Sequence, residues 1–251
     1  MITKERQTRI LEMVRNQSFV SVKELMDQLH ASRSSIVRDL IELEQQGLLV
    51  RERGGASANR VYQEIATEKK AHIHVKEKQC ICAQAAKTIK ENQCIYIDSG
   101  TTTSYMVEHI ADKDILLVTS STYLIHQLPL TFQGQVFLLG GQYDRRLDTA
   151  LGSTTLEMVS HFHFDHAFLS ANGIDLKSQE IYTANTELAT FKKAILKQST
   201  QCDLLADASK FEVKTHCTWA YIDDFDTIFV DNGPKYKPFT ICQKGNNYEN
   251  K

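Results

Sequence analysis

The chain has 251 residues, 42% of them hydrophobic, and a formal net charge of −2. That length and apolar content allow one or two buried cores, and the charge excludes a chain that is basic or acidic throughout. The sequence shows neither a signal-peptide-like start nor an apolar run as long as a membrane span. We therefore expect a cytoplasmic protein that does not engage membranes.

Charge and cysteines are distributed unevenly along the chain. Residues 1–60 carry ten Lys and Arg against eight Asp and Glu, which leaves 19 against 23 for the remainder. A mildly basic start has the sign that a DNA-binding segment needs. The six cysteines are scattered and form no Cys-x-x-Cys pair, so we predict no metal site and no cofactor.

The first predicted domain contains three helices, and the second of them has a clear start. A first helix is expected from about residue 3 to residue 15. Ser21 stands three residues before Glu24, which is the spacing of a capping box, and Val20 and Leu25 occupy the two positions of a hydrophobic staple. These signals predict a well-defined helix start at Ser21.

The third helix, capped by Ser32, has the two faces that a recognition helix needs. An apolar stripe would dock it onto the other helices, and a polar face with one guanidinium would remain exposed. The stripe holds Ile36, Leu40 and Leu43, and the polar face holds Ser34, Arg38 and Gln45. A helix of this kind is typical of the helix-turn-helix class of DNA-binding domains.

A basic wing is expected after the third helix, which Gly47 would end as a left-handed cap. A strand at residues 48–50 leads into a turn at residues 51–55 that carries two arginines at its edge. This order predicts a winged helix-turn-helix domain over residues 1–57; the alternative is a small helical interaction domain with solvated arginines. The residues expected to contact DNA are Ser21, Ser32, Arg33, Ser34, Ser35, Arg38, Arg51 and Arg53.

The segment from Cys94 to Thr103 is the most informative part of the remaining chain. A β-branched and aromatic run ends at an acid, a glycine and several hydroxyls, which predicts a strand that feeds a helix through a phosphate-sized loop. Gly100 permits close backbone approach, and the amides and hydroxyls of residues 101–103 favour an anion at the helix start. An ordinary turn before a capped helix is the alternative.

A linker and a second domain are expected around this segment. Residues 58–75 are mixed and polar and are assigned to the linker, and residues 241–251 to a flexible tail. Between residues 76 and 240 strands alternate with helices, which predicts an α/β domain on a mainly parallel sheet. Strands are expected at 94–98, 115–118, 136–139, 167–169, 203–205 and 228–230, and helices near 76–89, 102–110, 121–128, 154–161 and 187–197.

The predicted strands are followed by polar residues, where a parallel α/β sheet binds its ligands. Hydroxyls, glycines and one lysine recur in these loops, although each loop alone also fits ordinary turn chemistry. The residues predicted to line a ligand site are Asp98, Ser99, Gly100, Thr101, Thr102, Thr103, Thr119, Ser120, Ser121, Gly140, Gly141, Asn172, Glu187 and Lys210. Glu187 opens a later helix and is a candidate contact for a ligand hydroxyl.

Two parts of the sequence resemble DeoR-type bacterial transcriptional regulators. The matching residues are 32–40 (SRSSIVRDL), 43–44 (LE), 47–48 (GL), Arg51 and 54–56 (GGA) in the first domain, and the polar loops with residues 207–211 (DASKF) in the second. The family usually has Thr at the position of Ser35, Arg-Arg at residues 37–38, Asn at the position of Ser120 and Gly at the position of Ser170. The resemblance covers nearly the whole chain.

This resemblance implies a sensor domain similar in fold to ribose-5-phosphate isomerase and regulated by a phosphorylated sugar. It implies that residues 99–103 bind the phosphate with Lys210 as counter-charge, while Ser120, Asn172 and Glu187 contact sugar hydroxyls. The expected protein is a repressor of a sugar catabolic or uptake operon without enzymatic activity. Its partners would be double-stranded operator DNA, the sugar phosphate, and further copies of itself in a dimer or tetramer.

Residues 161–166 (HFHFDH) offer a different interpretation, because they match the His-x-His-x-Asp-His ligand motif of metallo-β-lactamase-like hydrolases. That fold needs further ligands downstream, yet His216 is the only later histidine and no Gly-Gly follows His166. We therefore expect polar residues at a helix end rather than a metal site.

A sugar-phosphate isomerase-like enzyme that carries a DNA-binding head is the second alternative. Isomerisation requires a carboxylate base, for which Asp175 and Glu187 are candidates, and Glu187 with Lys193 resembles part of an isomerase site. The acidic Asp-Gly-Ala-Asp loop of those isomerases is absent from the sequence, which favours a regulator.

Overall fold

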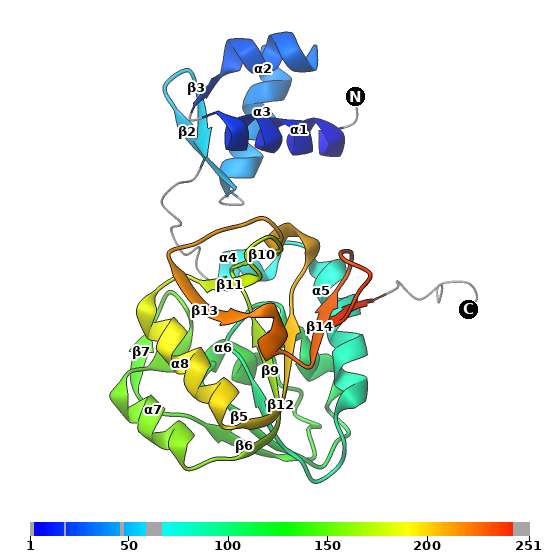
Figure 1. The fold of residues 1–251 in the computed structure, drawn as a ribbon, viewed down its shortest axis with the longest axis vertical. Coiled ribbons are helices and arrows are strands. Elements are labelled where there is room, and N and C mark those ends of the chain that lie inside the picture. Colours follow the sequence, from blue (N-terminus) through cyan, green and yellow to red (C-terminus); the bar gives the residue numbers. More distant parts are fainter. Residues whose placement is uncertain (1–2, 18, 46–47, 59–66, 243–251) are drawn as a thin grey trace, which may run out of the picture. The chain divides into compact units, whose positions relative to one another are not determined.

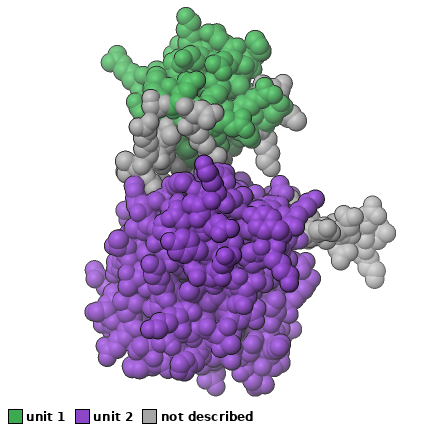
Figure 2. Space-filling model, viewed as in Figure 1, with its two compact units in different colours: residues 1–65 green, residues 66–251 purple. Residues whose placement is uncertain are grey.

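The computed structural model describes residues 3–17, 19–45, 48–58 and 67–242. The chain divides into two compact units, residues 1–65 and residues 66–251, which Figure 2 shows in different colours. Each unit has a hydrophobic core of its own. We call them the head and the large unit and describe each by itself.

The described part of the head has three helices and a three-stranded antiparallel sheet (Figure 1). Its elements are α1 (Thr3–Asn16), β1 (Val20–Ser21), α2 (Val22–Leu29), α3 (Arg33–Gln45), β2 (Leu49–Glu52) and β3 (Gly55–Ala58), with strand order β1-β3-β2. Strands β2 and β3 form the wing, and Gly54 in their turn has a φ of 90°, which favours glycine. The predicted winged helix-turn-helix is therefore confirmed as the fold of the head, while Gly47 lies outside the described residues.

A capping box, a small core and a largely buried ion pair hold the described part of the head together. Ser21 and Glu24 form the predicted capping box at the start of α2. Arg6 of α1 donates to the carboxylate of Asp39 on α3 at 2.5 Å, and this ion pair is largely buried, which fixes α3 against α1. The core consists of Ile10, Val14, Val20, Leu25, Leu29, Ile36, Leu40, Leu43, Leu49 and Ala56.

A seven-stranded sheet organises the large unit, and all its neighbouring strands run parallel. Six of the seven strands were predicted, with boundaries that differ by up to four residues. The seventh, β15, was not expected, because residue 241 was assigned to a tail; Ile241 instead pairs with Val230. The order is β15 (Phe239–Ile241), β14 (Thr227–Val230), β12 (Ser199–Leu205), β9 (Phe164–Ser170), β4 (Cys94–Ile97), β5 (Leu116–Thr119) and β6 (Gln135–Leu138).

Helices cover both faces of this sheet (Figure 1). Successive strand residues point to opposite faces, so Ile95 and Ile97 pack into one core and Tyr96 into the other. The first face carries α5 (Val75–Ala85), the 3-10 helices η1 (Ala86–Thr88) and η2 (Thr103–His109), and α6 (Thr122–Gln127). The second face carries α7 (Ser153–Ser160) and α8 (Thr186–Lys197).

Several short elements had no signal in the sequence pattern. They are α4 (Thr67–Ala71), the hairpin β7 (Gln142–Asp144) and β8 (Thr149–Leu151), the antiparallel sheet β10 (Gly173–Asp175), β11 (Glu180–Thr183) and β13 (Cys217–Tyr221), and the 3-10 turns η3 (Ala208–Lys210) and η4 (Ile222–Asp224). Helix α4 falls within the predicted linker but bonds to the large unit, because the Thr67 amide donates to the Arg146 carbonyl at 3.0 Å. None of the described helices is long and apolar enough to cross a membrane.

Candidate functional site

The sheet topology places most of the predicted ligand residues at one edge. Strands β12, β9, β4, β5 and β6 are consecutive neighbours and parallel, so the loops that follow them leave the sheet on the same side. Residues 98–103 follow β4, residues 120–121 follow β5, and residues 140–141 lie just beyond β6. Asn172 follows β9 and Lys210 follows β12. Glu187 comes from the start of α8.

Asp98 is the first residue after β4 and ties the loop that it opens to the neighbouring strand. One carboxylate oxygen accepts the Ser99 amide at 2.9 Å. The other accepts the amide and hydroxyl of Ser170 at 3.0 and 2.5 Å and contacts the buried ammonium of Lys192. Asp98 therefore supports the loop, whereas the sequence placed it among the effector contacts.

The loop itself packs closely against β9. A Cβ at Gly100 would lie 2.1 Å from the Ser170 hydroxyl, so only glycine fits this approach. The buried hydroxyl of Thr103 lies 2.8 and 2.9 Å from the carbonyl oxygens of Gly100 and Asp98 and donates within the loop. Helix η2, which begins at Thr103, is a 3-10 helix and not the predicted α-helix. Ser99 and Thr101 keep partly exposed side chains at this loop.

A lysine from α5 reaches the same loop. The ammonium of Lys78 donates to the Thr101 hydroxyl at 3.1 Å and to the Lys70 carbonyl at 2.7 Å, and only 3% of the residue is exposed. Burial lowers its pKa to about 8, although Asp207 opposes this shift. The loop after β4 therefore has a cation beside it that the sequence did not predict.

Asp207 and Lys210 complete a charged cluster with Lys78. Burial favours the neutral form of Asp207, but Lys210, the Ser209 hydroxyl, His74 and Lys78 outweigh it and lower its pKa. One Asp207 oxygen accepts from Ser209, and the other is buried without a hydrogen-bond partner among the described residues. Two lysines and the loop hydroxyls thus provide what an oxyanion needs, namely charge and hydrogen-bond donors.

The hydroxyls at the end of β5 and just after it are already bound to the protein. Thr119 donates to the Ile97 carbonyl at 2.7 Å, and Ser121 caps α6 by accepting the Leu124 amide at 3.1 Å. The Ser120 hydroxyl lies 2.8 Å from that of Thr149 and is fully buried. These three residues shape the edge of the sheet, and the predicted hydroxyl contact of Ser120 with a sugar would require that its bonds rearrange.

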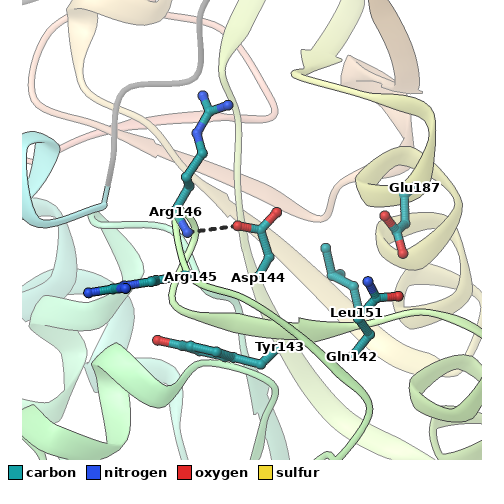
Figure 3. A pocket seen from close by; sticks show the side chains of 7 residues that line it. All are labelled: Gln142, Tyr143, Asp144, Arg145, Arg146, Leu151 and Glu187. Atoms are coloured by element: carbon teal, nitrogen blue, oxygen red, sulfur yellow. Dashed lines mark hydrogen bonds between the residues drawn. The ribbon is translucent and has the colours of Figure 1, made fainter.

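A pocket of about 290 Å³ lies between the β7–β8 hairpin and α8. Figure 3 shows Glu187 projecting from α8 on one side and the hairpin residues on the other. The lining residues are Gln142, Tyr143, Asp144, Arg145, Arg146, Leu151 and Glu187. Gly141 precedes the hairpin and has a φ of 148°, which favours glycine. A Cβ there would lie 2.0 Å from the Thr155 hydroxyl, so the absence of a side chain lets this turn pack against α7. Of the ligand residues predicted from the sequence, Glu187 is the one that lines this pocket.

Asn172 is held in place by β11. Its backbone amide donates to the Tyr182 carbonyl at 2.9 Å, and its side-chain oxygen accepts a hydrogen bond from the Thr183 hydroxyl at 3.4 Å. The side chain is half-buried beside the carboxyl end of β9.

The head presents the predicted polar face on α3. Arg33, Ser34 and Arg38 are exposed, and Ser32 caps the helix by accepting the Ser35 amide at 3.2 Å. On the wing, the Arg51 guanidinium pairs with Glu44 of α3 at 2.9 Å. The other predicted wing cation, Arg53, is exposed at the turn.

Sequence reasoning missed Lys78 and Lys192, and both carry the same signal. Lys78 shares its buried stripe with Ile81, Cys82 and Ala85, and Lys192 shares its stripe with Leu188, Phe191 and Ile195. A lysine at a core position of an amphipathic helix requires a buried partner, so this spacing could have identified both. The lysine that the sequence suggested was the next residue, Lys193, which is exposed.

The histidine motif at residues 161–166 does not converge. His166 is fully buried and bonds Asp203 of β12 at 2.7 Å, whereas Asp165, adjacent on β9, is exposed and accepts the Cys94 amide. Neighbouring strand residues point to opposite faces, which separates these two side chains. Within the described part of the chain, no three His, Cys, Asp or Glu side chains gather as a metal site requires.

Comparison with known proteins agrees with this architecture. Residues 6–61 match the family profile of the DeoR-like helix-turn-helix domain, and residues 73–232 match that of the DeoR C-terminal sensor domain. The chain belongs to the DeoR family of transcriptional regulators.

Similar proteins include regulators that align over almost their whole length. The uncharacterized HTH-type transcriptional regulator FruR of Bacillus subtilis is 33% identical over 92% of both chains. The glycerol-3-phosphate regulon repressor of Escherichia coli is 28% identical over 95% of this chain and 94% of the relative. The solved ribose 5-phosphate isomerase of Methanocaldococcus jannaschii is 14% identical over 53% of each chain, with a TM-score of 0.39, and no activity follows from that likeness.

Proposed function

We propose that this protein represses a sugar catabolic or uptake operon and that a phosphorylated sugar is its effector. The observation that carries the proposal is the cluster of Lys78 and Lys210 at the loop of residues 98–103. Two ammonium groups favour a phosphate over a neutral hydroxyl, because the anion adds Coulomb attraction to the hydrogen bonds that either acceptor would receive. The name of one relative, the glycerol-3-phosphate regulon repressor, agrees with a phosphorylated ligand class.

The phosphate would lie against Ser99, Gly100 and the side chain of Thr101, with the two lysines as counter-charges. Thr102 and Thr103 are buried and would contribute backbone donors only. Asn172 is a candidate contact for sugar hydroxyls beside β9, and Glu187 is another candidate at the hairpin pocket. This assignment separates the effector site from the head, which would act on DNA in the cytoplasm.

The head would read a pseudo-palindromic operator through α3 and the wing. Arg38→Ala should abolish sequence-specific binding, because the residue is exposed on the recognition helix. Arg53→Ala and Arg51→Ala should weaken all sequences alike and lower the salt slope by about one each. Gel shifts with the protein's own upstream DNA test this, with Arg9→Ala as the control on α1. Unchanged specific affinity in Arg38→Ala would contradict the assignment.

The effector class is tested by titration of a labelled operator complex. Phosphorylated sugars should change operator affinity, and the same sugars without phosphate should leave it unchanged. Lys210→Ala should impair that response and spare operator binding, because the head is a separate unit. Equal responses to a sugar and its phosphate would show that the loop after β4 is only a turn.

We further propose that the large unit does not catalyse isomerisation. One candidate base, Asp175, is bound by the ammonium of Lys214, which is the main cause of a pKa far below the ordinary range, with further bonds from Lys177 and Ser178. A carboxylate held in this way is a poor proton acceptor. Glu187→Gln is the second test. Sugar-phosphate turnover that survives repurification and disappears in this variant would reverse the proposal.

A dimer or tetramer is the proposed form, because a single head of this size reads only half of a two-fold operator. The strand β6 supports self-association. It ends the seven-stranded sheet of the described residues, and its Val136, Phe137 and Leu138 are each about 40% exposed. Residues 129–139 contain no charged side chain, and an unprotected edge strand of this kind is a template for pairing with another chain.

A further inference from the structure

Helix α4 is the first described element of the large unit after the head, and it is fastened at both ends. At its start, the Thr67 amide donates to the Arg146 carbonyl at the tip of the β7–β8 hairpin. At its end, the Lys70 carbonyl accepts from the Lys78 ammonium at 2.7 Å, and the Ala71 carbonyl accepts from the Tyr105 hydroxyl at 3.0 Å.

Both groups that hold the end of α4 lie beside the loop of residues 98–103, which is the proposed phosphate site and is called the phosphate loop below. Tyr105 is part of η2, which the loop opens, and its hydroxyl is the group that reaches α4. Lys78 makes a second bond to the Thr101 hydroxyl, at 3.1 Å, so one ammonium joins the loop to the α4 backbone. Any anion that contacts the Thr101 hydroxyl comes within reach of the same ammonium.

From this arrangement we propose that Lys78 transmits occupancy of the phosphate loop to α4, and so to the segment that leads to the DNA-binding head. This inference rests on the proposed function of the loop. A phosphate competes with the neutral Lys70 carbonyl for the ammonium, and it competes well, because the opposite charges of phosphate and ammonium attract each other in addition to the hydrogen bond. As Lys78 turns toward the anion, the end of α4 loses a bond. A ligand can drive a conformational change only if some contact differs between the free and the bound state. Here that contact is the hydrogen bond from Lys78 to the Lys70 carbonyl, present without phosphate and lost with it.

The Ile73 amide reports whether the end of α4 stays in place, because it donates to the same Lys70 carbonyl at 3.2 Å. Hydrogen exchange of a peptide covering residues 67–78 should be measured in the full chain, with inorganic phosphate and with chloride at equal ionic strength. Phosphate should raise exchange in the wild-type protein about tenfold, the effect of losing one hydrogen bond from a charged donor. Calorimetry on the same samples reports whether phosphate is bound.

The variant Lys78→Met should show the raised exchange without any phosphate and no further rise when phosphate is added. Lys210→Met is the matched control: it removes a cation from the same cluster but no bond to α4. It should weaken phosphate binding and keep the wild-type exchange in chloride. The wild-type measurement stands even if Lys78→Met folds poorly.

Two results separate this inference from the proposed function. If calorimetry shows phosphate bound and exchange at residues 67–78 stays level or falls in the wild-type protein, the coupling through Lys78 is wrong and the effector site stands. If neither phosphate nor sugar phosphates bind, the proposed effector site is wrong. The structural link from Lys78 to α4 is then tested by comparing exchange of Lys78→Met and the wild-type protein in chloride alone. Equal exchange in Lys78→Met and wild type there overturns it.

Discussion

The ammonium of Lys78 titrates within about one unit of neutral pH, because burial lowers its pKa to about 8. An anion at Thr101 would favour the charged form and raise that pKa. The association constant for a non-titrating anion should therefore be constant below pH 8 and fall by up to about tenfold per pH unit above it. Sulfate calorimetry between pH 6.5 and 9.5 measures this.

The matched variant for this pH profile is Lys78→Met, which should bind sulfate weakly and without a step near pH 8. A wild-type profile that stays flat through pH 9 would mean that Lys78 does not face the anion.

Lys192 and Asp98 form the buried charge pair on which the loop depends. Asp98→Asn leaves the ammonium without a negative partner, and breaking a buried pair costs about 3 kcal/mol or more. Urea unfolding monitored by tryptophan fluorescence measures this loss of stability. Trp219 is the only tryptophan and lies in the large unit, with the Lys192 ammonium 5.2 Å from its ring centroid. Adding Lys192→Met to Asp98→Asn should recover part of the loss. Glu187→Gln, at an exposed carboxylate, should change stability by less than about 0.5 kcal/mol; a similar small effect in Asp98→Asn would contradict the argument.

At the scale of elements, the sequence predicted what depends on local periodicity. The capping box at Ser21 and six parallel strands were found because their signals lie within a few residues. The hairpin β7–β8 and the sheet β10-β11-β13 were missed, because most of these short strands lack the run of consecutive apolar residues that marks the buried strands β4, β5 and β14. Their stability comes from packing against α7 and α8, which is a non-local effect.

The candidate site was predicted in outline and not in its partners. Strand ends marked the loops at residues 98–103 and 208–210. The contacts of Lys78 with Thr101 and of Lys192 with Asp98 join residues 23 and 94 positions apart, which no local pattern encodes. For the same reason Asp98 and Ser120 were expected to face a ligand, although their polar atoms are bonded inside the protein.

At the scale of the whole molecule, the proposed recognition of a two-fold operator requires that copies of the chain associate, and the exposed edge of β6 is the surface proposed for that association. Two β6 edges related by a two-fold axis would pair antiparallel. Any contact that residue i of one copy makes with residue j of the other would then also be made by residue j of the first copy with residue i of the second. Leu138→Lys adds a charge to an edge strand, which is the device that natural sheets use against such pairing. Sedimentation velocity should therefore show a smaller species than the wild-type protein, together with weaker operator binding, although α3 is untouched. Tyr221→Lys is the control, because Tyr221 is 54% exposed on β13, away from this edge. If Leu138→Lys sediments as the wild-type assembly does, the copies associate through another surface.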